Sequence, residues 1–154
     1  MSTTNNPFVA KAEMLIRKPV TEVFEAFVNP EITSMFWFTK SSGRLEEGKE
    51  VTWTWEMYNV SVPVNVKSVV PNKTILISWG NYKEETTVEW TFTEMKNNST
   101  FVSIVNSGFK GDNEQLIAQI RDATEGFTLV LAGLKAYLEH TIQLNLVGDR
   151  FSQE

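Results

Sequence analysis

The sequence predicts one α+β domain in which a curved antiparallel sheet wraps around a long C-terminal helix. Between residues 51 and 109 the chain alternates apolar and polar side chains, as strands with one buried face do. Residues 112–146 instead carry apolar side chains at helical spacing. The apolar stripe of that helix needs a partner surface, and the sheet supplies one. A sheet wrapped on a single helix often leaves space between the two, so this space is the first place to look for a function.

The N-terminal part predicts one strand followed by a two-helix insert. Residues 8–17 alternate loosely and end at Lys18-Pro19, where the fixed φ of proline suits the first turn of a helix. Apolar residues at helical spacing then predict a short helix that Asn29-Pro30 stops, and residues 31–37 predict a second one. The polar residues 1–7 are expected to be a disordered tail.

The next segments predict strands joined by short turns, and therefore antiparallel hairpins. Their apolar positions are Val51, Trp53, Trp55 and Met57; Val60, Val62, Val64 and Val66; Ile75, Ile77 and Trp79; and Val88, Trp90 and Phe92. A last strand is expected over residues 101–109. Thr52, Thr54 and Glu56 fall on the opposite, solvent-facing side of the first of these strands. Pro63 suggests an edge position or a bulge, because proline cannot donate to a ladder.

The C-terminal helix has one continuous apolar face. It comprises Phe127, Val130, Leu131, Leu134, Tyr137 and Leu138. A straight helix over residues 112–146 would be roughly 50 Å long at about 1.5 Å per residue, longer than the strands beneath it. We therefore expect a break near residues 122–126, where Asp122 to Glu125 resembles a capping box. Gly126 and Gly133 are expected to allow close approach to the sheet.

Composition narrows the function classes. The 154 residues form a single expected domain, 1–154, without an internal linker. A net charge of −5 without a basic stripe argues against nucleic acid as a partner. The absence of cysteine excludes disulfides and thiolate metal sites. No apolar run approaches the ~20 residues of a membrane span, so a cytoplasmic protein without a membrane span is expected.

The order of elements resembles the helix-grip fold of the START-like, or SRPBCC, superfamily, also called Bet v-like. Residues 16–31, with Pro19, Val23-Phe24 and Asn29-Pro-Glu31, look like its opening signature. Ser107-Gly-Phe109 and the helical positions from Glu125-Gly-Phe127 to Glu139 are similar to the branch of the activator of heat-shock-protein-90 ATPase homologue. The resemblance implies the fold strongly and the activity weakly, since the superfamily includes ligand-binding proteins, polyketide cyclases and co-chaperone modules.

Catalytic and metal chemistry find little support in the residues. His140 is the only histidine, and it fits best as a surface residue near the negative end of a helix. No serine stands in a nucleophile elbow, and no acidic spacing suggests a metal site. We expect neither a cofactor nor a catalytic residue.

The candidate site is an apolar cavity between sheet and helix, with aromatic side chains that offer large contact areas. Its expected lining is Trp53, Trp55, Met57, Ile77, Trp79, Trp90, Phe92, Phe127, Leu131 and Leu134, and its expected mouth is Phe24, Phe27, Met35, Phe36 and Trp37. Tyr58, Asn65, Tyr82, Arg17 and Asn106 are the few polar residues that could orient a ligand. All of these aromatic residues could instead be ordinary core.

The sequence therefore favours a non-catalytic protein that binds a small apolar or aromatic ligand of unknown identity. The first alternative is a protein-interaction module like the co-chaperone relatives, which would use an exposed apolar surface and a protein partner. The second is a cyclase-like enzyme, which needs polar groups inside the cavity poised for acid/base work.

Overall fold

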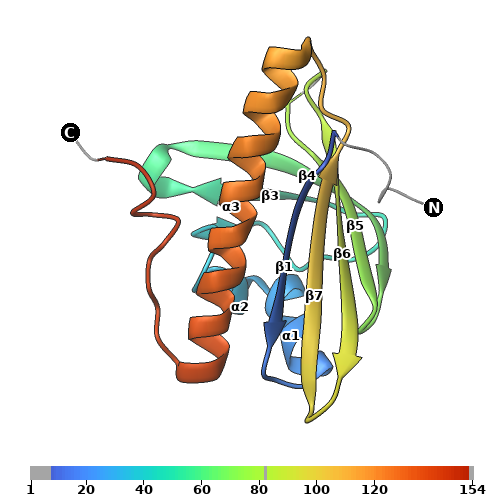
Figure 1. Ribbon diagram of the computed structural model, residues 1–154, viewed down its shortest axis with the longest axis vertical. Helices are drawn as coiled ribbons and strands as arrows, with labels where there is room; N and C mark the ends of the chain where they lie inside the picture. Colours follow the sequence, from blue (N-terminus) through green and yellow to red (C-terminus); the bar gives the residue numbers. More distant parts are fainter. Residues whose placement is uncertain (1–7, 82, 153–154) are drawn as a thin grey trace.

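The computed structural model describes residues 8–81 and 83–152, and the expected tail 1–7 and Tyr82 lie outside them. Its seven-stranded antiparallel sheet has the order β1-β7-β6-β5-β4-β3-β2 (Figure 1). The strands are β1 Ala10–Ile16, β2 Lys40–Ser41, β3 Glu50–Trp55, β4 Val60–Val70, β5 Thr74–Trp79, β6 Thr86–Met95 and β7 Ser99–Ser107. The helices are α1 Val20–Val28, α2 Pro30–Thr33, the 3-10 turn η2 Glu56–Tyr58, and α3 Asn113–His140. The predicted α+β helix-grip fold is confirmed.

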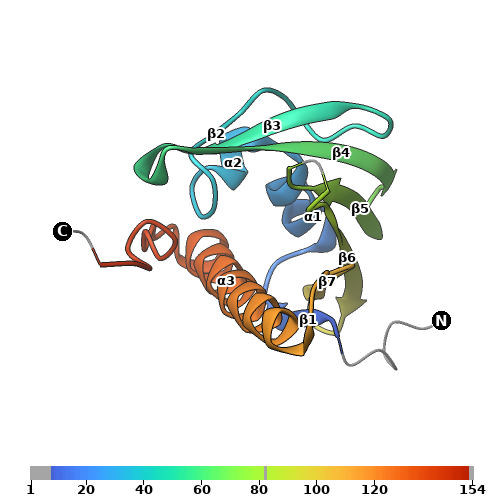
Figure 2. The same cartoon turned by 90° about the horizontal axis from the view of Figure 1, so that it is seen from above.

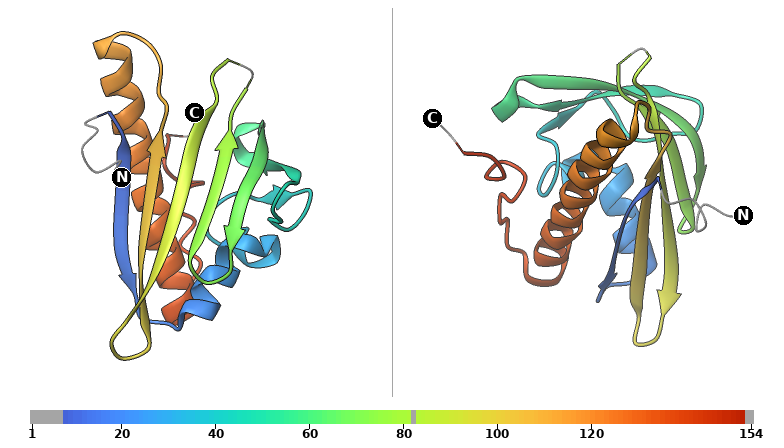
Figure 3. Two further views of the ribbon diagram at one scale, coloured as in Figure 1. Left: turned by 90° about the vertical axis from the view of Figure 1, so that its right-hand side faces the viewer. Right: turned by 45° about the horizontal axis from the view of Figure 1, so that its top comes forward.

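The sheet is strongly curved, and α3 lies across its open side. Figure 2 shows α3 running beside β1, while β3 and β4 lie on the far side of the molecule with α1 and α2 between. Figure 3 shows α1 and α2 gathered at one end of the sheet. Contacts agree with this view, because α3 packs chiefly on β1 and α1 packs on β6 and β7. The helix α3 therefore lies close to the β1 side of the sheet. Toward the β3–β4 side, other segments, including α1 and α2, lie between it and the strands.

The predicted strand faces are confirmed. Trp53 and Trp90 are each only 1% exposed, whereas Thr52 and Glu56 are exposed. Met57 does not follow the pattern and is 37% exposed. The chain leaves the sheet after Trp55 and forms the η2 turn, so the alternation of β3 no longer applies at Met57.

Pro63 lies inside β4, a central strand, where it pairs with Thr52 of β3. On its other side the β4–β5 ladder begins only at Val64, and the Pro63 carbonyl accepts a bond from the Gly80 N–H at 3.3 Å. The missing proline N–H therefore points past the end of the ladder, where β4 is locally an edge. The bulge in β4 lies elsewhere, between Val66 and Ser68.

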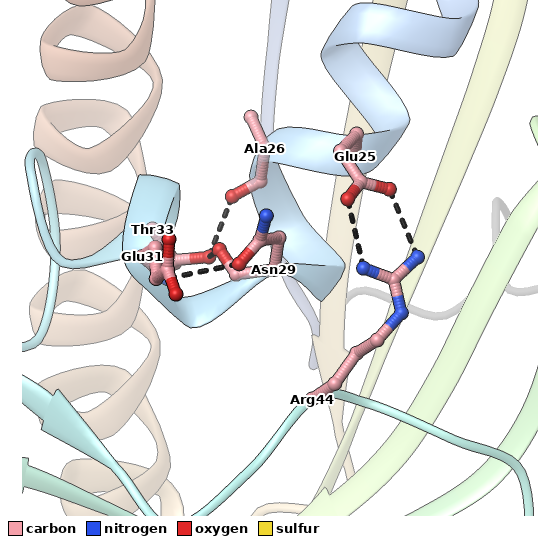
Figure 4. A network of polar contacts seen from close by, with 6 residues as sticks. All are labelled: Glu25, Ala26, Asn29, Glu31, Thr33 and Arg44. Carbon is pink, nitrogen blue, oxygen red and sulfur yellow. Dashed lines mark hydrogen bonds and ion pairs between the residues drawn. The ribbon is translucent and has the colours of Figure 1, made fainter.

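The insert is fixed by a small polar network around the junction of α1 and α2 (Figure 4). Asn29 Oδ1 accepts from the Glu31 N–H at 3.1 Å, and the Thr33 hydroxyl donates to the carbonyls of Ala26 and Asn29. Asn29 thereby caps the start of α2, which ends at Thr33, earlier than the predicted residue 37, and the chain continues in turns. Arg44 adds a two-pronged bond to Glu25, which lowers the pKa of that carboxyl.

The predicted break near residues 122–126 is wrong, because α3 is one helix of 28 residues. Its capping box is formed by Asp112 and Gln115. Its last residue is His140, and the C-cap Thr141 has a left-handed φ of 56°, so the helix stops short of the expected residue 146. The helix is longer than the strands, and its first turns lie in solvent. Figure 1 shows these turns projecting past the end of β7, and Ile117 is 57% exposed.

The last turn of α3 is tied to the end of β1. The Glu139 carboxylate accepts bonds from the Arg17 N–H and from Lys135 Nζ, both at 2.7 Å. Lys135 Nζ also donates to the Leu15 carbonyl at 2.8 Å. Burial raises the pKa of Glu139, but the bonds from Lys135 and Arg17 and the charges of Lys135 and His140 outweigh it, so the pKa lies below its ordinary value.

We expect Glu139→Gln to lower the free energy of unfolding at pH 7 by about 1 to 3 kcal/mol, because a partly buried charged acceptor with two donors is lost. Since the folded pKa is depressed, this contribution is present above the ordinary glutamate pKa and disappears as pH falls through the folded value. Urea unfolding curves of the wild type and of Glu139→Gln should therefore converge at acid pH. Glu89→Gln, on the exposed face of the sheet, is the control. An equal loss of unfolding free energy there would contradict a stabilising tether, meaning the bonds of Glu139 and Lys135 to the end of β1.

In the described part of the chain, none of the helices combines the length and apolar character needed to cross a bilayer.

Candidate functional site

A pocket of about 580 Å³ lies between α3, the ends of β3 to β7 and the segment that follows α3. It is partly open to solvent. Its walls are Trp37, Trp55, Tyr58, Val60, Trp79, Thr86, Asn106, Phe109, Gln119, Asp122, Ala123, Gly126, Phe127, Leu129, Val130, Val147, Arg150 and Phe151. The pocket therefore lies on the side of α3 that faces β3, β4 and β5, away from its packing on β1.

Aromatic rings form the inner wall of this pocket. Phe127 of α3 lies 5.7 Å from Trp37 and 5.9 Å from Trp79, measured between ring centroids. Trp55 completes the group at 6.2 Å from Trp37 and 6.4 Å from Trp79. These edge and tilted contacts present ring surfaces from the insert, the sheet and the helix toward one space.

The outer wall is the segment after α3, residues 141–152, which folds back toward η2. The Tyr58 hydroxyl donates to the carbonyls of Val147 at 2.5 Å and Gly148 at 3.2 Å. The ring of Phe151 lies 5.8 Å from the ring of Tyr58. The Tyr58 hydroxyl therefore uses its proton within the protein and holds residues 147–148 of the outer wall in place.

Arg150 fastens the same segment to α3. Its Nη2 donates to Asp122 Oδ1 at 2.8 Å, to the Asp122 carbonyl at 3.1 Å and to Glu125 Oε1 at 2.9 Å. A Cβ at position 126 would lie 3.1 Å from Arg150 Nη1, so Gly126 makes room for this guanidinium. Gly133 likewise faces Phe36, at 3.3 Å for an added Cβ. The expectation that both glycines approach the sheet is wrong.

Thr86 and Asn106 form a polar site in the otherwise largely apolar pocket wall that the sheet contributes. The Thr86 hydroxyl oxygen accepts from Trp79 Nε1 at 3.1 Å and from Asn106 Nδ2 at 3.0 Å. Asn106 Nδ2 also donates to the Thr87 carbonyl at 2.9 Å, and Asn106 is only 3% exposed. The bonds hold the Trp79 indole against the pocket and fix the orientation of the carboxamide.

Only part of the predicted cavity lining borders the pocket. Trp55, Trp79 and Phe127 do, and so does Trp37 from the predicted mouth. The other predicted lining residues, Trp53, Ile77, Trp90, Phe92, Leu131 and Leu134, are buried in the packed core, while Met57 is exposed outside the pocket. Strand parity gives the inward face but not the position along the strand at which the helix separates from the sheet.

The remaining predicted mouth residues belong to the core or to the surface. Phe24 and Phe27 pack on Phe92, with ring centroids 5.3 and 5.9 Å apart, and Phe36 packs on Phe27 at 5.5 Å. Met35 is 37% exposed. The insert therefore closes one end of the sheet as packed structure, and only Trp37 reaches the pocket.

Of the predicted polar residues, Tyr58 and Asn106 line the pocket. Arg17 lies at the junction of β1 with the end of α3, and Asn65 pairs with Glu50 in the β3–β4 ladder, away from the pocket. Tyr82 lies outside the described residues. His140 is an exposed residue in the last turn of α3. Among residues 8–81 and 83–152, no group of histidine and acidic side chains could hold a metal ion.

Sequence reasoning missed the wall made by the segment after α3. Val147, Arg150 and Phe151 contribute to the pocket, although residues up to 146 were expected to continue the helix. The turn signal in Asn145 and Gly148-Asp149 could have shown that the chain reverses here.

A family model described as activator of Hsp90 ATPase homolog 1-like protein matches residues 17–139. The chain belongs to this family. The match runs from the end of β1 to the last turn of α3, and so includes the insert, the curved sheet and the helix that build the pocket.

Solved structures share this fold. Protein SSP2350 from Staphylococcus saprophyticus is 32% identical, with a TM-score of 0.76 over 88% of this chain and 95% of that one. The Aha1 dimer from Colwellia psychrerythraea is 17% identical, with a TM-score of 0.73 over 86% and 96% of the two chains. PFC0360w, an HSP90 activator from Plasmodium falciparum, is 15% identical, with a TM-score of 0.66 over 85% and 96%. The chain has no significant match among curated proteins.

Proposed function

We propose that this family member binds a small aromatic or largely apolar molecule in the pocket between α3 and the sheet, without converting it. The observation that carries the proposal is the pocket itself, with about 580 Å³ walled by Trp37, Trp55, Trp79 and Phe127. Ligand sites typically enclose about 300 to 1,000 Å³ and combine aromatic walls with a few fixed polar groups. Thr86 and Asn106 are such groups here.

The ionisable side chains at the pocket favour binding over catalysis. Tyr58 already donates to the carbonyls of Val147 and Gly148. Asp122 and Arg150 are paired with each other across the rim. A general acid or base must be within reach of the substrate proton and free to exchange it, and these groups are engaged in holding the wall.

A protein-interaction role is the second candidate, favoured by one surface feature. Met35 and Met57 are both 37% exposed and border a small groove that Leu146 completes. Flexible methionine side chains suit adaptable apolar contacts. PFC0360w, the structural relative from Plasmodium falciparum, is an HSP90 activator, which makes a chaperone the first partner to try. The open aromatic pocket makes ligand binding the stronger candidate.

Ligand binding is expected to quench tryptophan emission, because three tryptophans line the pocket. Titration with 7-hydroxyflavone, a naphthalene derivative and palmitate should give saturable quenching for at least one class. The melting temperature should rise with the concentration of that ligand, as linkage requires. A flat response in both measurements across the panel would instead support the interaction module.

A matched pair of variants tests whether the pocket is the binding site. Ala123 lines the pocket, whereas Ala118 is exposed on the same helix. Ala123→Phe should weaken binding about tenfold or more by occupying pocket volume, and Ala118→Phe should leave it unchanged. Equal binding by both variants would show that the ligand sits elsewhere.

A further inference from the structure

The hydrogen bonds around Thr86 leave one donor and one acceptor without a partner at the pocket wall. A threonine hydroxyl has one proton and two lone pairs. In Thr86 the oxygen already accepts from Trp79 Nε1 and Asn106 Nδ2, so its own proton is available to donate. No acceptor for that proton occurs among the residues that the structure describes.

Asn106 presents the complementary group. Its Nδ2 uses both protons, one toward the Thr86 hydroxyl and one toward the Thr87 carbonyl. Because a carbonyl can only accept, the amide nitrogen must face Thr87, and this fixes the carboxamide against a flip. The oxygen Oδ1 is left as an acceptor that no described residue bonds, on a side chain that is 3% exposed and lines the pocket.

Asn106 Oδ1 is an acceptor that solvent can reach, on a residue that lines the pocket, so a ligand that supplies a donor there is selected over an apolar ligand that displaces solvent without replacing its bond. We propose that Thr86 and Asn106 form a polar anchor that selects neutral aromatic ligands carrying a phenolic hydroxyl. The phenol oxygen accepts from the Thr86 hydroxyl, and the phenol proton goes to Asn106 Oδ1. The aromatic body then lies against Trp79 and Phe127. This inference rests on the proposed ligand-binding function.

Charge favours a neutral phenol over a carboxylate. Arg150 is the cation at the rim, and it is already bonded to Asp122 and Glu125. An anionic ligand would have to displace these carboxylates or lie beside them, in a protein of net charge −5. The anchor itself offers one donor and one acceptor, which matches a hydroxyl better than an acceptor-only carboxylate.

The test compares 7-hydroxyflavone with 7-methoxyflavone by isothermal titration calorimetry on the intact protein. The methyl ether lacks the proton that Asn106 Oδ1 requires, so its Kd should be at least about tenfold weaker. Equal Kd values would overturn the anchor while leaving ligand binding in place. If neither these compounds nor any of the wider panel bound, the proposed function would fall, and the anchor with it.

Substitutions of Asn106 and Thr86 test whether these two side chains cause the preference for the phenol. Asn106→Leu and Thr86→Val should reduce the preference for the phenol to less than about threefold. Thr86→Ser keeps the hydroxyl and should keep the preference, so it controls for general disturbance of β6. Melting curves of each variant check folding, and the wild-type comparison of the two flavones stands even where a variant unfolds. An unchanged preference in folded Asn106→Leu would overturn the assignment.

Discussion

Trp53→Ala is expected to lower the free energy of unfolding by about 3 to 5 kcal/mol, the range for emptying a large aromatic site in a core. The indole is 1% exposed. It stacks on Phe38 at 4.9 Å and contacts Trp37 at 4.9 Å and Trp79 at 5.9 Å between ring centroids. The substitution therefore removes buried area and also the edge and stacking contacts that orient the inner wall of the pocket.

Urea unfolding followed by circular dichroism measures this loss. Val60→Ala is the control, because Val60 lies on the paired strand β4 and is 44% exposed. That substitution should change stability by less than about 1 kcal/mol. Similar losses at both positions would mean that the aromatic cluster around Trp53 does not form the core.

The second large effect is expected at Phe127. Phe127→Ala should cost about 3 kcal/mol, near the lower end for phenylalanine, because one side of the ring already borders the pocket. The ring is 5% exposed and contacts Trp37, Trp79 and Trp90. Its loss also widens the pocket between the insert and the sheet, so any ligand that uses the aromatic wall should bind more weakly.

Ile117→Ala is the matched control on the same helix, since Ile117 is 57% exposed in the overhanging turns. It should change the urea midpoint little. If Phe127→Ala left both stability and ligand affinity at wild-type values, the face of α3 assigned to the pocket would be wrong.

The sequence could predict the sheet because alternation reports directly which side of a strand is buried. Val51, Trp53 and Trp55 share the inner face as expected, and β3 to β7 pair as consecutive hairpins. The length argument for a broken helix failed because it assumed that every turn of α3 must lie on the sheet. The first turns project into solvent instead, and Thr141 rather than Gly126 sets the limit of the helix.

The pocket could be predicted only in part, since it depends on where two elements separate. Trp55, Trp79 and Phe127 were expected and line it. Trp90 has the same strand parity as a lining residue, yet it lies deeper among Phe27, Trp37 and Phe127. The polar wall at Thr86 and the closing contacts of Arg150 join segments distant in sequence, and a one-dimensional pattern does not encode such contacts.

The tether between β1 and the end of α3 sets the order in which this protein can fold. The bonds from Lys135 to Leu15 and from Arg17 to Glu139 join residues 120 and 122 positions apart. During synthesis these contacts cannot form until the chain has been made to residue 139, and until β1 docks, one side of β7 stays an unpaired edge. We therefore expect closure of this junction to be a late step of folding, because the entropy of closing such a long loop must be lost before these non-local contacts form.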